Sequence, residues 1–86
     1  MLVGEIHMKL IEAVGLRTQE LLAEKKMSQY RLIRLAKFNE KTIPEIIKGK
    51  TSDIKITSIY RIATALGVSL KEFFNSPLFK QSNIEI

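Results

Sequence analysis

The chain has 86 residues, of which 45% are hydrophobic and 27% are charged, and it contains no Cys, no Trp and one His. A chain of this length forms one domain with a small core, because it hides only about 60 to 65% of the surface that its unfolded form exposes. This size argues against an enzyme with a deep pocket, and the lack of Cys excludes disulfides and thiolate metal sites. No apolar run approaches the roughly 18 residues of a membrane span, and the start lacks a signal-peptide pattern, so we expect a cytoplasmic protein that contacts no membrane.

The net charge of +5 is concentrated in the middle third of the chain. Residues 26–55 carry eight Lys and Arg against three Asp and Glu, whereas outside this window the two kinds balance at six each. Such a basic stretch is typical of a protein that binds a polyphosphate, because each neutralised phosphate releases condensed counterions. A solvated helix face is the alternative, and charge alone does not separate the two.

The first predicted helix occupies the N-terminal part of the chain and ends near Lys25 and Lys26. Gly15 weakens the prediction for its first half, because glycine is a poor helix former. The spacing of four apolar residues places them on one face of this helix: Leu10, Val14, Leu21 and Leu22.

A short second helix is predicted over residues 28–36. Ser28 is a suitable N-cap, because its hydroxyl can accept a hydrogen bond from a free backbone N–H of the first turn. The turn that follows spans Lys37 to Asn39. The expected buried stripe of the second helix consists of Leu32, Ile33 and Ala36.

The third predicted helix has two candidate caps and ends at Gly49. If Asn39 is the N-cap, Pro44 lies inside the helix and removes one backbone hydrogen bond. If Thr42 is the N-cap, Pro44 falls in the first turn, where its missing N–H has no cost, and Thr42 and Glu45 have capping-box spacing. Glu45 would then have a structural role. The expected buried stripe consists of Ile43, Ile46 and Ile47.

Two further helices complete the prediction of an all-α, compact five-helix bundle. Gly67 ends the fourth helix, and the spacing of Ser69 and Glu72 is that of a capping box that opens the fifth. Strand signals are weak throughout the chain. The apolar face of the fourth helix is predicted to consist of Ile56, Ile59, Ile62, Ala63 and Leu66.

Three segments carry a resemblance to a known family: Gln29 with the Leu32–Ile33 pair and its turn, residues 42–50, and residues 59–70. Together they resemble the phage-repressor (Cro/cI, XRE) helix-turn-helix family, whose fold is lambda-repressor-like. The most specific part is Leu-Gly-Val-Ser-Leu at residues 66–70. The resemblance implies a helix-turn-helix DNA-binding domain over residues 13–75, with residues 1–12 as an N-terminal extension and residues 76–86 as a C-terminal tail.

The resemblance also implies a function. We expect a sequence-specific, repressor-like transcriptional regulator that binds double-stranded DNA as a homodimer, with the third helix in the major groove. An antitoxin-like or other protein-interaction module built on the same bundle is the alternative. No nucleophile–base pair, Gly-rich phosphate loop or metal cluster occurs in the sequence, so we expect no enzymatic activity, no cofactor and no small-molecule effector.

The resemblance assigns base contacts to Glu40, Lys41 and Glu45. The chemistry agrees, because Lys donates to guanine O6 and N7 and a carboxylate accepts from the cytosine N4 amine. Phosphate contacts are expected at the start of the second helix and around the end of the third, where solvated caps and turns are the alternative. These phosphate-contacting candidates are Gln29, Lys48, Lys50, Thr51, Ser52 and Lys55.

Besides Pro44 in the third helix, the chain departs from the pattern of the family at Lys37 and at the pair formed by Leu22 and Ile47. Lys37 stands where relatives often have Gly, so the turn is either strained or has its positive φ shifted to Asn39. Leu22 and Ile47 stand where many relatives have a paired Arg and Glu. Because both are apolar, the fold is expected to tolerate the replacement.

The C-terminal end is rich in apolar residues for so small a chain. A homodimer formed through the fifth helix and the tail is one interpretation, and packing into the protein's own core is the other. The residues concerned are Phe73, Phe74, Leu78, Phe79, Ile84 and Ile86.

Overall fold

The computed structural model describes residues 8–51, 53–80 and 84–85. Within these ranges the chain forms five α-helices, as predicted: α1 (Leu10–Glu24), α2 (Gln29–Ala36), α3 (Thr42–Ile47), α4 (Ile56–Leu66) and α5 (Leu70–Phe74). The 3₁₀ turn η1 (Pro77–Phe79) follows α5. Two-residue strands, β1 (Met8–Lys9) and β2 (Ile84–Glu85), pair in parallel. None of the helices in the described ranges is long and apolar enough to span a membrane.

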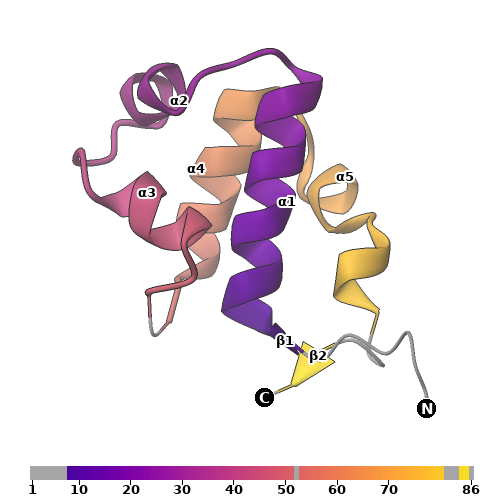
Figure 1. Cartoon of the computed structure of the whole chain (residues 1–86). Coiled ribbons are helices and arrows are strands. Elements are labelled where there is room, and N and C mark those ends of the chain that lie inside the picture. The colour runs from indigo at the N-terminus through magenta and orange to yellow at the C-terminus, as the bar shows by residue number, and fades with distance from the viewer. Residues whose placement is uncertain (1–7, 52, 81–83, 86) are drawn as a thin grey trace.

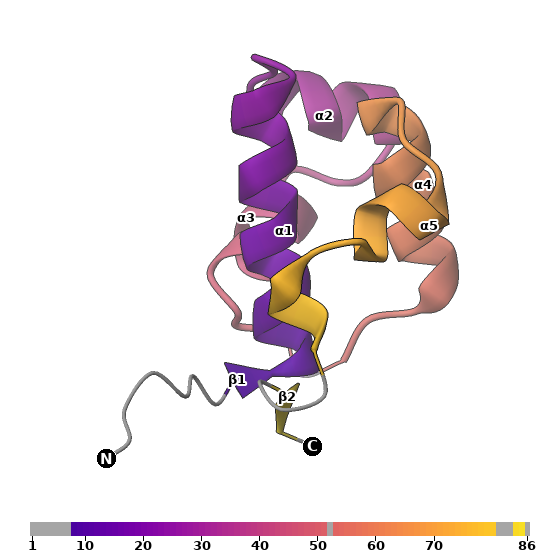
Figure 2. The ribbon, with the colours of Figure 1, turned by 90° about the vertical axis from the view of Figure 1, so that its right-hand side faces the viewer.

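The helices surround α1, which runs through the middle of the bundle with α4 behind it (Figure 1). α2 and α3 lie on one side of α1, and α5 and η1 lie on the other. In the view turned by 90°, α5 and η1 face the viewer and α3 lies behind α1 (Figure 2). The basic middle segment of the chain and its apolar C-terminal segment are therefore on opposite sides of the molecule.

The predicted apolar faces meet in one core, with two exceptions. Leu10 and Ile56 were expected on buried faces, but their side chains are 48% and 59% exposed. Each is the first residue of its helix, where few neighbours cover it, and periodicity predicts a face but not the end of the bundle. The core cluster consists of Val14, Leu21, Leu22, Leu32, Ala36, Ile43, Ile46, Ile59, Ile62, Ala63, Leu66, Val68 and Phe73.

Three predicted helix ends are confirmed. The Ser28 hydroxyl accepts a hydrogen bond from the Arg31 N–H at 3.1 Å, which caps α2. The Ser69 hydroxyl accepts from the Glu72 N–H at 3.0 Å, and the Glu72 carboxylate accepts from the Ser69 N–H, so the capping box of α5 is formed. Gly67 ends α4 with a left-handed backbone, φ 78°. These local signals predict boundaries well because cap and helix are adjacent in sequence.

Gly15 brings α1 and α3 into close contact. α1 continues through it without a break, and a Cβ built at this position would lie 2.3 Å from the carbonyl oxygen of Ile46 and 3.1 Å from that of Ile47. Real Cβ atoms do not approach a backbone oxygen so closely, so the two helices can be this near only because Gly15 has no side chain. The residue that weakens the helix prediction is therefore required for packing.

The apolar replacement of the family's ion pair is accommodated by the core. Leu22 is 7% exposed and belongs to the core cluster, and Ile47 is partly buried and packs against the same cluster. A charge at either position alone would lose water without gaining a partner. This packing agrees with the prediction that the fold tolerates two apolar residues in place of the ion pair.

Much of the C-terminal end packs inside the chain. The rings of Phe74 and Phe79 are 4.9 Å apart between centroids, and Phe74 lies 5.3 Å from Phe73, which is fully buried. The Arg17 guanidinium donates hydrogen bonds to the backbone oxygens of Phe73 and Glu72, both at 2.8 Å, and so ties α5 to α1. These contacts favour core packing as the role of this segment, although Ile86 lies outside the described residues.

The two ends of the described chain are adjacent. Met8 pairs with Ile84 and Lys9 with Glu85, directly below the start of α1 (Figure 1). The segments expected to be an extension and a tail therefore contact each other, and α1 already begins at Leu10.

Candidate nucleic-acid interface

Asn39 forms the entry to α3. Its side-chain oxygen accepts hydrogen bonds from the Lys41 N–H at 3.0 Å, the Thr42 N–H at 3.2 Å and the Thr42 hydroxyl at 2.9 Å. α3 begins at Thr42, so Pro44 is its third residue and lies in the first turn, where its missing N–H has no cost. The N-cap position is Lys41, whose side chain makes no capping hydrogen bond, so the prediction that Asn39 is the N-cap is wrong. Asn39 instead holds the turn just before the helix, and the penalty expected for Pro44 does not arise.

The alternative cap at Thr42 is wrong. The Thr42 hydroxyl and N–H are both bonded to Asn39, and among the described residues α3 has no capping box with Glu45. The structural role considered for Glu45 therefore does not apply, and its side chain is exposed.

The turn before α3 retains its left-handed residue at Lys37. Lys37 has φ 60° and ψ 41°, whereas Asn39 is not among the described residues with positive φ. The interpretation that moved the positive φ to Asn39 is therefore wrong. The N–H groups of Lys37 and Phe38 both donate to the carbonyl oxygen of Ile33, which closes the end of α2. Because Lys37 carries a Cβ, this conformation needs support from its surroundings.

Arg61 of α4 supplies contacts at this turn that the sequence did not reveal. Its Nη2 donates to the carbonyl oxygens of Ala36 and Lys37, both at 2.6 Å, and its Nε donates to Ala36 at 3.1 Å. The guanidinium carbon also lies 4.1 Å from the centroid of the Phe38 ring. Arg61 is 24 residues from Lys37 along the chain, so this contact cannot be predicted from helical periodicity or from the spacing of helix caps.

Gly49 ends α3 in a Schellman motif. It has φ 70°, its N–H donates to the carbonyl oxygen of Ile46 at 3.1 Å, and the Lys50 N–H donates to that of Glu45 at 3.0 Å. The chain then turns away toward α4. The helix is therefore short, and Lys48 and Lys50 flank its end.

The candidate base-reading residues lie on or just before the exposed side of α3. Ile43 and Ile46 are 0% and 2% exposed and face the core. Lys41 and Glu45 are exposed and four residues apart, so they are neighbours on the opposite surface of the helix. Glu40 is exposed in the turn that precedes α3. An apolar back with long polar side chains in front is the arrangement that a groove-binding helix requires.

Five of the six candidate phosphate contacts are described, and Ser52 lies outside the described residues. Four are exposed and the fifth, Thr51, is half-buried. A surface hollow of ≈ 400 Å³ between α3 and the start of α4 is lined in part by Glu45, Thr51 and Lys55, so the fold brings these three together. The exposed four are Gln29 at the start of α2, Lys48 at the end of α3, Lys50 in the following loop and Lys55 at the start of α4.

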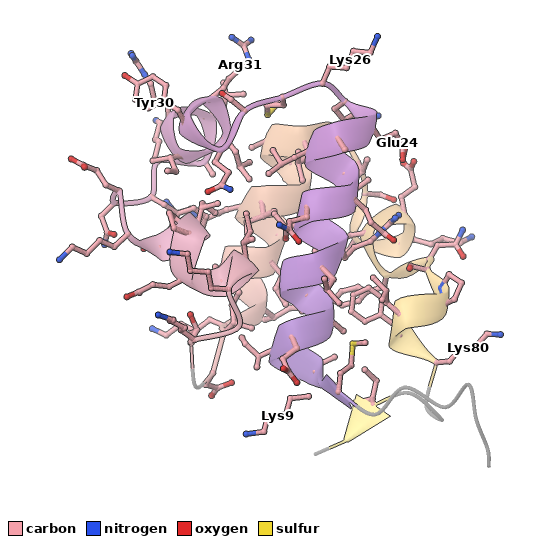
Figure 3. The ribbon with its side chains drawn as sticks, viewed as in Figure 1. Lys9, Glu24, Lys26, Tyr30, Arg31 and Lys80 are labelled. Atoms are coloured by element: carbon pink, nitrogen blue, oxygen red, sulfur yellow. The ribbon has the colours of Figure 1, made fainter. Side chains whose placement is uncertain are left out.

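The cations of the middle segment are exposed, and none of them forms an ion pair within the described residues. All eight Lys and Arg of residues 26–55 are exposed, and Figure 3 shows Lys26 and Arg31 pointing away from the bundle beside α2. In the part of the chain that the structure describes, the one ion pair joins Arg17 to Glu20 within α1, at 3.1 Å. Among the residues that the structure describes, no group of three or more His, Cys, Asp or Glu side chains could hold a metal ion. The surface around α2 and α3 is therefore suited to a polyanion.

Comparisons with known proteins agree with this geometry. The family model of the Cro/C1-type helix-turn-helix DNA-binding domain matches residues 17–77, which include α2, the turn and α3. The crystal structure of the prophage Lp1 protein 11 is similar to this chain, with 28% sequence identity and a TM-score of 0.73, over 85% of this chain and 99% of that one. A search of curated proteins found no match.

Proposed function

Because the chain belongs to the family of Cro/C1-type helix-turn-helix DNA-binding domains, we propose that it is a sequence-specific, repressor-like regulator of transcription. The observation that carries this proposal is the surface of residues 26–55, where eight cations are exposed and none is paired with a described carboxylate. Such a surface attracts the DNA backbone, and α3 presents its polar side within it.

The proposed complex has α3 in the major groove of double-stranded DNA. Lys41 donates to guanine O6 and N7, and Glu45 or Glu40 accepts from a cytosine N4 amine. A carboxylate close to phosphates also repels them, so the two Glu residues reject sites that offer no amine. The sequence preference of the protein would then depend on three side chains.

The remaining candidates hold the DNA backbone on both sides of α3. Gln29 lies at the N-terminus of α2, where free N–H groups favour a phosphate. Lys48, Lys50 and Lys55 follow α3, and Thr51 lines the same hollow between α3 and α4 as Lys55, which supports a shared role. Contacts of this kind set the register of the helix on the duplex and contain no sequence information. Ser52 is proposed for the same role from its place in the loop.

The protein is proposed to act as a homodimer in the cytoplasm. Two copies would bind half-sites about one helical turn apart, roughly 34 to 36 Å, and would repress transcription by occupying a promoter. The name of the similar crystal structure identifies a prophage protein, which supports a phage-repressor-like role.

Selection of duplexes from a random-sequence DNA library tests the proposal. We expect one enriched sequence with two related half-sites. We also expect the logarithm of the affinity to fall by roughly 0.9 for each phosphate contacted when the salt concentration is raised tenfold. Failure to enrich any sequence, together with an affinity that does not depend on salt, would exclude a DNA-binding regulator.

A further inference from the structure

Arg61 connects α4 to the carbonyl end of α2. Its planar guanidinium donates three hydrogen bonds to the carbonyl oxygens of Ala36 and Lys37 and lies over the ring of Phe38 at 4.1 Å. All three residues belong to the last turn of α2 or to the turn that leads to α3. One side chain from a distant helix therefore holds the segment that joins the two helices of the motif.

The turn needs this support for two reasons. Lys37 has a left-handed backbone, φ 60°, which is unfavourable for a residue with a Cβ. The last carbonyl groups of a helix have no partner within it, and a cation at this end of α2 satisfies them and interacts favourably with the helix dipole. Without Arg61, Lys37 would more often adopt ordinary backbone angles, and the direction of α3 would change with them.

We propose that Arg61 is a positioning residue for DNA recognition, which sets the direction of α3 by holding the turn and does not itself contact DNA. This inference depends on the proposed DNA-binding function. Base contacts require side chains to be placed accurately, whereas attraction to phosphates tolerates displacement. Loss of Arg61 should therefore lower affinity for a specific sequence much more than affinity for DNA in general.

The chain offers a matched control in Arg17. Its guanidinium donates to the carbonyl oxygens of Phe73 and Glu72 at the end of α5, as Arg61 does at the end of α2. α5 lies on the opposite side of the bundle from α3 (Figure 1). Arg17→Ala therefore removes the same kind of backbone contact and the same charge, together with the ion pair to Glu20, without loosening the turn before α3.

The first measurement needs no DNA. The Phe38 N–H is bonded to the carbonyl oxygen of Ile33 only while the turn is closed, so its hydrogen exchange reports the turn. Arg61→Ala should speed this exchange about tenfold, and adding Lys37→Gly should reverse most of the change, because Gly adopts positive φ readily. Arg17→Ala should leave the exchange rate unchanged.

The second measurement compares two duplexes, one selected by the wild-type protein from a random library and one with the same bases scrambled. Arg61→Ala should weaken binding to the selected duplex about tenfold and binding to the scrambled duplex less than about twofold, with an unchanged salt slope. Arg17→Ala should leave the ratio of the two affinities unchanged. Arg61→Lys, which keeps the charge but not the planar fork, is the second variant if Arg61→Ala does not fold, and should lower the ratio in the same direction.

Three outcomes overturn the proposal. Equal losses on both duplexes with a salt slope smaller by about one unit would make Arg61 a phosphate contact. An unchanged affinity ratio and exchange rate in Arg61→Ala would show that the turn is held without it. If the wild-type protein selects no duplex, the proposed DNA-binding function fails, and the role of Arg61 in recognition fails with it. This outcome is seen with the wild-type protein alone, so it is distinguished from a failure that only the variants show.

Discussion

α3 is held at two junctions of different construction. At the junction with α1, Gly15 allows the backbones to approach so closely that a Cβ would lie 2.3 Å from the carbonyl oxygen of Ile46. At the junction with α2, an exposed turn is held by hydrogen bonds from Arg61 to two carbonyl oxygens. Excluded volume in a buried contact leaves no freedom, whereas water can replace hydrogen bonds at an exposed turn. Stability should therefore depend mainly on the first junction, and the direction of α3 mainly on the second.

The largest effect is expected from a charge placed in the buried core beside the first junction. Leu22→Arg should lower the free energy of unfolding by about 3 to 5 kcal/mol, because the guanidinium would be buried without a partner. Adding Ile47→Glu should recover much of the loss, since the resemblance places these positions as an ion pair. Chemical denaturation of both variants measures this coupling, and Ala23→Arg, at an exposed position of the same helix, is the control. If the double variant is no more stable than the sum of the singles, the two positions are not paired.

A smaller but still large effect is expected at the first junction itself. Gly15→Ala should lower the free energy of unfolding by about 2 kcal/mol, because the added methyl group would push the backbone of α3 away from α1. Helix propensity alone predicts the opposite, a gain of about 1 kcal/mol. Thermal and urea denaturation decide between the two signs, with Gln19→Ala on the exposed side of α1 as the control. A stabilised Gly15→Ala protein would contradict the close approach of α1 and α3.

The two junctions also differ in what the sequence reveals about them. The caps at Ser28 and Ser69 could be predicted because each donor and acceptor pair lies within three residues. Gly15 and Arg61 could not be interpreted in this way, because their partners lie 23 to 32 residues away and have no periodic spacing. The resemblance supplied the fold and the candidate DNA contacts. The reason for Gly in α1, and the means by which Lys37 tolerates a left-handed turn, required the structure.

The exposed face of α3 should affect DNA binding with little effect on stability. Lys41→Ala should weaken binding to a selected duplex by about 1 to 3 kcal/mol and relax the preference at one base pair, because Lys41 is exposed at the start of α3. Lys50→Ala, beyond the end of the helix, should weaken all duplexes alike and lower the salt slope by about one unit. Titrations of both variants on selected and scrambled duplexes at two salt concentrations measure the difference. A uniform loss for Lys41→Ala would make it a phosphate contact and leave base reading to Glu40 and Glu45.

The smallest expected effect concerns the backbone of the turn at the second junction. Lys37 has positive φ, and so does Lys26 in the connection between α1 and α2, at φ 54°. Gly relieves about 1 to 2 kcal/mol of left-handed strain but loses about 0.5 to 1 kcal/mol through the entropy of the unfolded chain, so each Lys→Gly variant should be more stable by roughly 0.5 to 1 kcal/mol. Lys25→Gly is the control, because Lys25 has ordinary helical angles, φ −86°, and should become less stable.

DNA binding then distinguishes the effect of the two glycine variants from the loss of the Arg61 hydrogen bonds at the turn. While Arg61 is present, it holds the carbonyl oxygen of residue 37 whichever side chain stands there, so Lys37→Gly should keep the affinity ratio of selected to scrambled duplex. Lys26→Gly should keep it as well, because its turn does not lead to α3. If Lys37→Gly alone lowers the ratio as strongly as Arg61→Ala, the Lys37 side chain itself contributes to recognition. Recognition would then depend on the exposed Lys37 side chain as well as on the backbone of the turn.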